Sequence, residues 1–195
     1  LPIPPTRSLQ NPKISLTQIK VVDAKGGDKV VFNINGDGKK TEMQLWPRHC
    51  VQNTWGAQLH KDLKILDNQN IVYKGTNPHI DAFSAFWDNE KIYNTDLKEM
   101  LVKKGITDVY VCGICTDVCV GATANDSLEE GYRTILIESC SRGISEDNIQ
   151  ATKKNITNKN GIVIQSKQVK NLVSGSDRPS CLAIKRAMEI SKIEK

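Results

Sequence analysis

Cysteine chemistry stands out in one segment of the sequence, residues 111–124. Cys112, Cys115 and Cys119 fall within eight residues, and a helical pattern follows the glycine turn after Cys112. A cysteine in the first turn of a helix is stabilised as a thiolate by the helix macrodipole, and backbone N–H groups beside it can bind a developing oxyanion. Cys119 is therefore a candidate nucleophile. The alternative is a small buried side chain, since free cysteine is among the most buried residue types.

The same segment allows two other cysteine chemistries. Cys112-Gly113-Ile114-Cys115 is a Cys-x-x-Cys pair after a strand, as in thioredoxin-like redox sites. Cys112 completes an apolar run, however, and should pack in a sheet, and no thioredoxin-like order of elements surrounds the pair. The three cysteines are also potential zinc ligands, but no second cluster nearby completes a set of four. The pattern favours the nucleophile over both of these sites.

Lys74 and His49 are the other side chains that can take part in chemistry. Lys74 ends a strand-like run, where a lysine can point into a cleft and hold a thiolate or carboxylate in its charged form. A solvated strand end is the alternative for Lys74. His49 is flanked by bulky and apolar groups, and such a histidine is more often structural than a ligand. The three histidines form no His-x-His or His-Glu-x-x-His pair that would complete a metal site.

These side chains need elements that position them, and from about residue 70 the pattern becomes regular. We predict strands at 70–74, 108–112, 134–137 and 161–164, and helices over 93–104, 118–130, 145–156 and 182–193. Ser145 is a candidate N-cap, and Gly131 is a candidate helix stop. Strands that alternate with helices predict an α/β fold, a doubly wound parallel sheet with helices on both faces. Functional residues of such sheets gather at the carboxyl ends of strands, which favours Lys74 and the turn after Cys112.

Residues 1–45 are weakly patterned and rich in proline and glycine. We predict an irregular loop region there, with a short strand near residues 30–34 and one hairpin. Residues 46–195 should form the regular α/β core. Together the two parts are expected to make a single domain over 1–195.

Composition limits the classes of function. The chain has 195 residues, a formal charge of +5, 38% hydrophobic and 25% charged residues, which excludes a disordered chain, a collagen and a coiled coil. Scattered basic residues and 5% aromatics argue against a nucleic-acid partner, and no apolar run is long enough for a membrane. No secretory signal is visible, so the six cysteines predict free thiols in the cytoplasm, with the nucleus left open.

Three segments of the chain together resemble a known family. Residues 45–59, which contain Trp46-Pro47-Arg48-His49-Cys50, are similar to the tryptophan–proline–x–histidine–cysteine segment of nicotinamidases, a group of the isochorismatase-like cysteine hydrolases. Residues 71–76 and 81–86 resemble the catalytic-lysine strand of that family and the loop after it. Residues 113–124 resemble its nucleophile turn. Three motifs in the family's order, within residues 45–145, make a specific signal.

The resemblance implies a three-layer α/β/α fold and an enzyme that hydrolyses nicotinamide to nicotinate and ammonia through a thioester. Cys119 matches the nucleophile of the family, and Lys74 matches its catalytic lysine. The resemblance further implies an oxyanion hole made by the backbone N–H groups of Cys119 and Cys115, with a cis peptide before Cys115. The family often has alanine at the position of Cys115.

Metal and substrate contacts are implied by the same resemblance. His49 matches a ligand of a divalent metal, zinc by family expectation, that binds the pyridine nitrogen. Trp46 matches an aromatic wall of the nicotinamide pocket, and Phe86 is a second candidate there. The expected partner is thus a small-molecule substrate, with a homo-oligomer left open.

One part of the family pattern has no counterpart in residues 1–45: an aspartate on the first, central strand and an Asp-x-His pair that completes the metal site. We therefore expect the N-terminal part of the enzyme and the remaining metal ligands upstream of Leu1. A sheet without its middle strand leaves unpaired backbone groups, so these residues alone should be unstable and inactive. Two alternatives remain: a relative that hydrolyses another small amide, and a truncated, inactive relative that acts as a binding protein.

Overall fold

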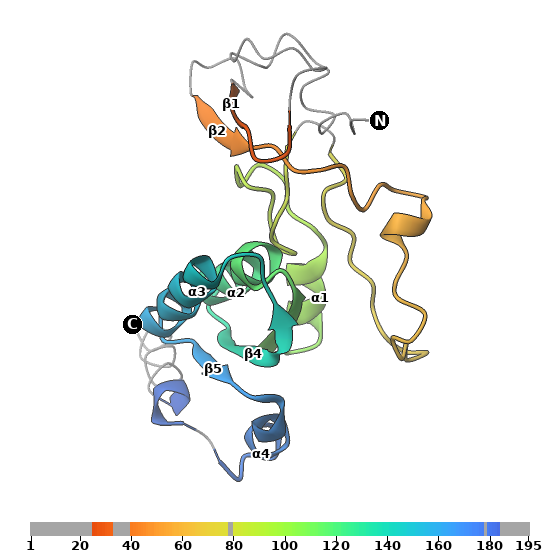
Figure 1. Cartoon of the computed structure of the whole chain (residues 1–195). Helices are drawn as coiled ribbons and strands as arrows, with labels where there is room; N and C mark the ends of the chain where they lie inside the picture. The colour runs from red at the N-terminus through yellow and green to blue at the C-terminus, as the bar shows by residue number, and fades with distance from the viewer. Residues whose placement is uncertain (1–24, 33–39, 78–79, 178, 184–195) are drawn as a thin grey trace. The chain divides into compact units, whose positions relative to one another are not determined.

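The structure is a computed structural model that describes residues 25–32, 40–77, 80–177 and 179–183. It contains two compact units (Figure 1), one formed by Leu1–Ile71 with Thr76–Asp81 and the other by Val72–Gly75 with Ala82–Lys195. The single domain over 1–195 stays a prediction. Among the described residues, no helix is both long enough and apolar enough to cross a membrane.

The first unit contains a small hairpin. Strand β1 (Lys29–Phe32) pairs antiparallel with β2 (Thr41–Gln44), with Val30 opposite Met43. Val30 and Leu45 are buried there, and one 3-10 turn, η2 (Trp55–Ala57), follows. The hairpin confirms the strand predicted near residues 30–34, of which 33 and 34 lie outside the described residues.

A parallel sheet forms the centre of the second unit. Its strands are β3 (Asp108–Ile114), β4 (Arg133–Arg142) and β5 (Ile162–Ile164), in the order β3-β4-β5. Both pairs are parallel, which confirms three predicted strands and the predicted kind of sheet. The register between β3 and β4 shifts between Val111 and Gly113, so the ladder is irregular where β3 approaches the candidate nucleophile.

Helices cover both faces of this sheet, α2 and α3 on one side and α4 on the other (Figure 1). The bounds are α1 (Leu97–Lys103), the π-helical turn η3 (Thr116–Val120), α2 (Gly121–Glu129), α3 (Glu146–Asn158), η4 (Ser166–Gln168) and α4 (Val169–Ser174). Gly131 has a φ of 93° just after α2, as expected of a helix stop. The predicted helix over 182–193 lies largely outside the described residues, although residues 180–183 are helical.

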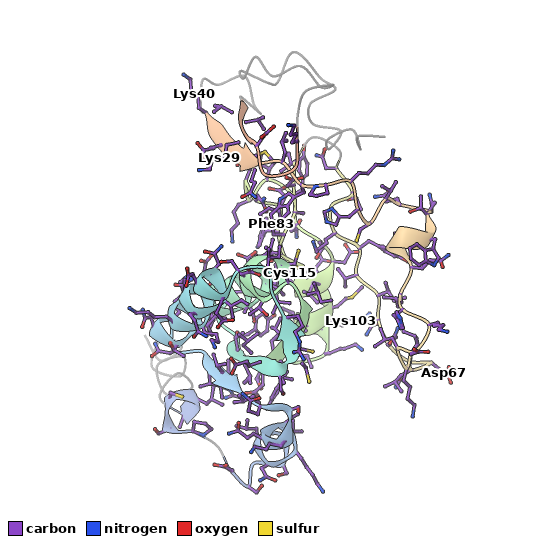
Figure 2. All side chains as sticks on the ribbon, viewed as in Figure 1. Lys29, Lys40, Asp67, Phe83, Lys103 and Cys115 are labelled. Carbon is purple, nitrogen blue, oxygen red and sulfur yellow. The ribbon has the colours of Figure 1, made fainter. Side chains whose placement is uncertain are left out.

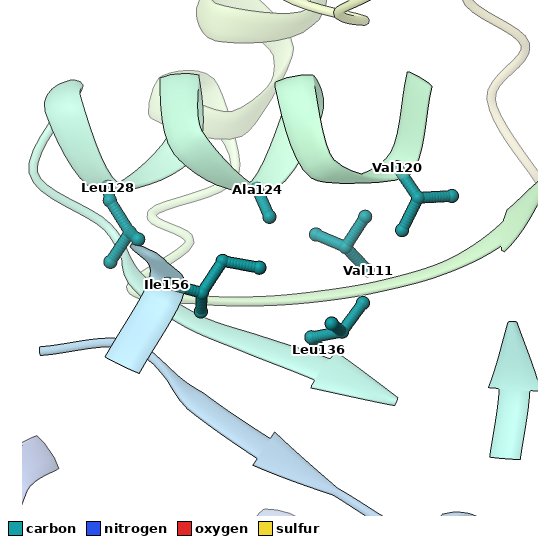
Figure 3. Packing of buried hydrophobic residues seen from close by; sticks show 6 residues of the cluster. All are labelled: Val111, Val120, Ala124, Leu128, Leu136 and Ile156. Atoms are coloured by element: carbon teal, nitrogen blue, oxygen red, sulfur yellow. The ribbon is translucent and has the colours of Figure 1, made fainter. Parts of the chain in front are cut away.

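Two apolar clusters hold the helices against the sheet, because alternate side chains of β4 face opposite ways. The first cluster lies under α2 and α3 (Figure 3) and contains Val111, Val120, Ala124, Leu128, Leu136 and Ile156. The second lies on the other face and contains Ile135, Ile137, Ile162, Ile164, Leu172 and Leu182. Each valine, leucine or isoleucine among them contributes about 1.5–3 kcal/mol on full burial. The predicted doubly wound α/β fold is confirmed.

The strand predicted at residues 70–74 is wrong. Residues 70–74 belong to no helix and no strand ladder within the described part of the chain. Ile71 is 53% exposed and Tyr73 is 76% exposed, so this apolar run is not a buried strand. An apolar run becomes a strand only where partner strands accept its backbone groups, and the described residues supply none here. Lys74 therefore lies in a loop.

Candidate active site

Two predicted residues come together in the second unit. Lys74 Nζ lies 3.6 Å from Cys119 Sγ and donates a hydrogen bond of 2.7 Å to the carbonyl oxygen of Ala82. Lys74 is exposed, and Cys119 is half-buried. An ammonium group at such a distance attracts a thiolate, and the thiolate is the nucleophilic form of cysteine. The carbonyl of Ala82 was not predictable, since any residue can supply a backbone acceptor.

Cys119 lies in a turn that leaves β3 abruptly. Gly113 has a φ of 126°, which a residue with a side chain rarely adopts, and the peptide bond between Ile114 and Cys115 is cis. This is the bond at which the family resemblance places a cis peptide. The π-helical turn η3 then starts at Thr116 and runs directly into α2. Cys119 is thus the fourth residue of the helix, within the first turn as predicted.

The hydrogen bonds of this turn flank the backbone of Cys119. The carbonyl oxygen of Cys115 accepts the N–H groups of Val118 and Val120, each at 3.0 Å. The bond from Val120 spans five residues, as in a π-bulge, a feature frequent at functional sites, and the two donors stand on either side of Cys119. Figure 2 labels Cys115, which precedes the turn.

Asp117 ties the nucleophile turn to the start of α3. Its carboxylate accepts the N–H of Ile144 at 3.0 Å and the N–H of Ser145 at 2.9 Å. Ser145 occupies the predicted N-cap position, but its own side chain makes no capping bond. Asp117 instead accepts the N–H of the N-cap residue itself and of the residue before it, and its negative charge suits the positive end of the helix. Sequence analysis missed this role because the acceptor comes from a distant segment.

The neighbouring cysteines differ from Cys119 in their surroundings. Burial, followed by the nearby thiol of Cys119 and the carboxylate of Asp117, raises the pKa of Cys115, which keeps that thiol protonated at neutral pH. Cys112 is exposed, whereas the sequence predicted that it packs in the sheet. The ladder between β3 and β4 is interrupted at this residue, between Val111 and Gly113. All six cysteines are free, as predicted.

Trp46 and His49 belong to the first unit. His49 is exposed, and its Nδ1 donates to the carbonyl oxygen of Pro47 at 2.7 Å. This bond places the lone pair of the neutral imidazole on Nε2, which is the arrangement of a metal-ligating histidine. Trp46 is half-buried. No three His, Cys, Asp or Glu side chains gather into a metal-binding group within the described part of the chain.

Phe86, which the resemblance places near the substrate, is a packing residue in this structure. It is 1% exposed, and its ring centroid lies 6.1 Å from that of Tyr132. A side chain this buried has no surface left for a ligand. We therefore leave Phe86 out of the substrate contacts proposed below.

Known proteins share this sequence and this fold. The isochorismatase domain matches residues 14–168. A nicotinamidase of Escherichia coli is 41% identical over 101 residues, which are 52% of this chain and 47% of the relative. The structure of a nicotinamidase pyrazinamidase of Acinetobacter baumanii superposes with a TM-score of 0.69 at 33% identity, over 75% of this chain and 68% of that one. A pyrazinamidase of Pyrococcus horikoshii in complex with zinc superposes with a TM-score of 0.54 at 34% identity, over 62% and 63%.

The extent of these matches decides what they show. The chain spans about half the length of the curated relatives it matches, 47%, 45% and 53% for three nicotinamidases. The domain match, by contrast, covers most of the chain and includes β3, the nucleophile turn and β5. The chain therefore belongs to the isochorismatase domain family, with the α/β fold of that family.

Proposed function

We propose that this chain carries the nucleophile of a nicotinamidase, which hydrolyses nicotinamide to nicotinate and ammonia. The observation that carries the proposal is the 3.6 Å contact between Lys74 Nζ and Cys119 Sγ. The similarity to curated nicotinamidases supports this substrate over other small amides. The nucleophile turn and the lysine belong to one compact unit, which supports their action as a pair.

In the proposed reaction, the thiolate of Cys119 attacks the carboxamide carbon of nicotinamide. The oxyanion that forms is bound by the backbone N–H groups of Cys119 and Cys115. The carbon–nitrogen bond then breaks, and the nitrogen takes up the proton that the thiol had lost and leaves as ammonia. Water attacks the resulting thioester and the carbon–sulfur bond breaks; one proton of the water goes to the sulfur and the other to ammonia, which leaves nicotinate. Lys74 stabilises the thiolate before the first step and after the last one.

A divalent metal is part of the proposal, because a zinc complex exists among the similar structures. His49 would hold it through Nε2, since Nδ1 is already committed to Pro47. Held by His49, such a metal would supply a Lewis acid for the ring nitrogen of the substrate, and Trp46 would be an aromatic wall for that ring. The described residues offer His49 without a complete ligand set, so no chemical step is assigned to the metal.

Ammonia release from nicotinamide by the intact protein tests this function. Cys119→Ser should abolish it, because a hydroxyl group is not ionised by a neighbouring ammonium at neutral pH. Cys140→Ser removes an exposed thiol of β4 in the same unit and should leave the rate unchanged. Trapping with acid should give a mass increase of one nicotinoyl group on the peptide that contains Cys119. Undiminished ammonia release by Cys119→Ser would refute the proposal.

A further inference from the structure

Thr123 makes two hydrogen bonds with a single hydroxyl group, one helical turn after Cys119. Its Oγ1 donates to the carbonyl oxygen of Cys119 at 2.7 Å and accepts the N–H of Ala85 at 3.0 Å. The first bond is an ordinary contact of a helical threonine with the carbonyl four residues earlier. The second bond joins α2 to a segment 38 residues away in the sequence.

These bonds close a ring of contacts around the candidate site. Lys74 Nζ contacts both the sulfur of Cys119, at 3.6 Å, and the carbonyl oxygen of Ala82, at 2.7 Å. Ala82 and Ala85 lie in one short segment, and the N–H of Ala85 is bound to Thr123. The acceptor that orients the ammonium group is therefore connected to the nucleophile through the hydroxyl of Thr123.

The same segment has further attachments, which lie away from Cys119. Thr95 Oγ1 donates to the carbonyl oxygen of Ala85 at 2.6 Å, just ahead of α1. Trp87 Nε1 donates to Glu130 at 2.9 Å, at the C-terminal end of α2. These bonds fix the segment to two other places in the unit. Thr123 makes the attachment at the end where Cys119 lies.

We propose that Thr123 is a positioning residue that sets the separation between the ammonium of Lys74 and the sulfur of Cys119. The inference deepens the proposed function, because it rests on Cys119 as the nucleophile. Thr123 acts through backbone groups and does not contact the sulfur. Without its hydroxyl, the segment that holds Ala82 loses its attachment to the Cys119 end of α2, and the ammonium is held less closely to the sulfur.

The expected size of the effect follows from the distance. Widening the 3.6 Å distance between Lys74 Nζ and Cys119 Sγ by about 1 Å should slow the alkylation of Cys119 by about 1.5- to twofold, for an effective dielectric constant between about 80 and 40 at this exposed contact. Iodoacetamide reacts with a thiolate and not with a thiol, so the effect is measurable without any substrate.

The experiment compares Thr123→Val with Thr123→Ser in the intact protein. The rate of alkylation of Cys119 by iodoacetamide is followed by peptide mass spectrometry from acid to alkaline pH. Thr123→Val, which keeps the shape but loses the hydroxyl, should react about 1.5- to twofold more slowly near neutral pH and reach the wild-type rate at alkaline pH. Thr123→Ser keeps the hydroxyl and should react like the wild type. Thr157→Val is the matched control, because Thr157 makes the same helical bond to the carbonyl four residues earlier, but in α3.

Two results would overturn the proposal. One is a wild-type rate in Thr123→Val, and the other is an equal slowing at every pH, which would indicate blocked access rather than a weaker charge contact. If Thr123→Val does not unfold cooperatively, hydrogen exchange of the wild type decides instead. The Ala85 amide should then be protected, and exchange at the rate of an unprotected amide would contradict the bridge. These measurements contain no nicotinamide, so they test the positioning role of Thr123 alone. The proposed activity is tested separately, by ammonia release.

Discussion

The charge of Lys74 should control the reactivity of Cys119, and Lys74→Met tests this directly. The substitution keeps most of the apolar side chain and removes the ammonium group that lies 3.6 Å from the sulfur. We expect the alkylation of Cys119 at neutral pH to slow, because the thiolate loses the nearest positive charge. Lys103→Met is the matched control, since it removes another lysine of the same unit from the last turn of α1.

The magnitude follows from Coulomb's law at the observed distance. Two unit charges 3.6 Å apart attract by about 1 kcal/mol in bulk water and by about 5 kcal/mol at an effective dielectric constant of about 20. Lys74 is exposed, so solvent screening restricts the value to about 1 kcal/mol. This corresponds to about fivefold in the alkylation rate near neutral pH.

The assay also separates charge from shape by varying the salt concentration. A charge contact at the surface weakens as salt shortens the Debye length, from about 10 Å at 0.1 M to about 3 Å at 1 M. The wild-type rate should therefore fall toward the Lys74→Met rate at high salt, whereas the variant should stay constant. Equal rates for wild type and Lys74→Met at low salt would refute the reasoning, as would a salt response that both proteins share.

Three further predictions concern stability. Asp117→Ala removes the acceptor that caps α3 and should cost about 1–2 kcal/mol in urea unfolding, so an unchanged midpoint would contradict the cap. Arg133→Met removes the guanidinium that pairs with the carboxylate of Asp108, and this pair is largely buried, so the free energy of unfolding should fall by about 3–5 kcal/mol. A fall of less than about 1 kcal/mol would show that water already screens the pair. The hydrogen bond from Lys98 lowers the pKa of Glu130 below its ordinary value of 4.5. A carboxylate whose pKa is lower in the folded protein than in the unfolded chain stabilises the fold at pH values above the unfolded pKa, and this stabilisation is lost as the pH falls through the folded pKa. Acid titration below pH 4.5 should therefore lower the free energy of unfolding more in the wild type than in Lys98→Met.

The order of elements after residue 100 could be predicted because each element carries its own local pattern. The apolar run of β3 and the glycine after α2 reflect local preferences, which can be recognised from the sequence of a single chain. Cys119 could be found in the same way, since a strand, a glycine turn and a helix follow one another directly. Its partner Lys74 was predicted on the assumption of a strand that the described residues do not contain, so the residue was found and its element was not.

The remaining features depend on contacts that no local pattern records. Asp117 binds the N-terminus of α3 from 28 residues away in the sequence. The capping rule considers only adjacent residues, so it selected Ser145 as the cap and could not find Asp117. The carbonyl of Ala82 and the N–H of Ala85 are backbone groups, which every residue type offers equally. Phe86 illustrates the converse limit, because its type fits an aromatic substrate wall as well as it fits the core in which the ring is buried.

Gly143 takes no part in the chemistry, but a side chain at this position would displace Asp117 and with it the nucleophile turn. A Cβ atom at this position would lie 2.6 Å from Asp117 Oδ1 and 2.6 Å from Ile149 Cγ1, distances that real Cβ atoms essentially never show. In a library of random variants selected for solubility, position 143 should stay nearly invariant while its exposed neighbour Ile144 accepts many residue types. Gly143→Ala should thus push Asp117 and Ile149 away from position 143. We expect it to lower the activity partially, although every reacting group is still present.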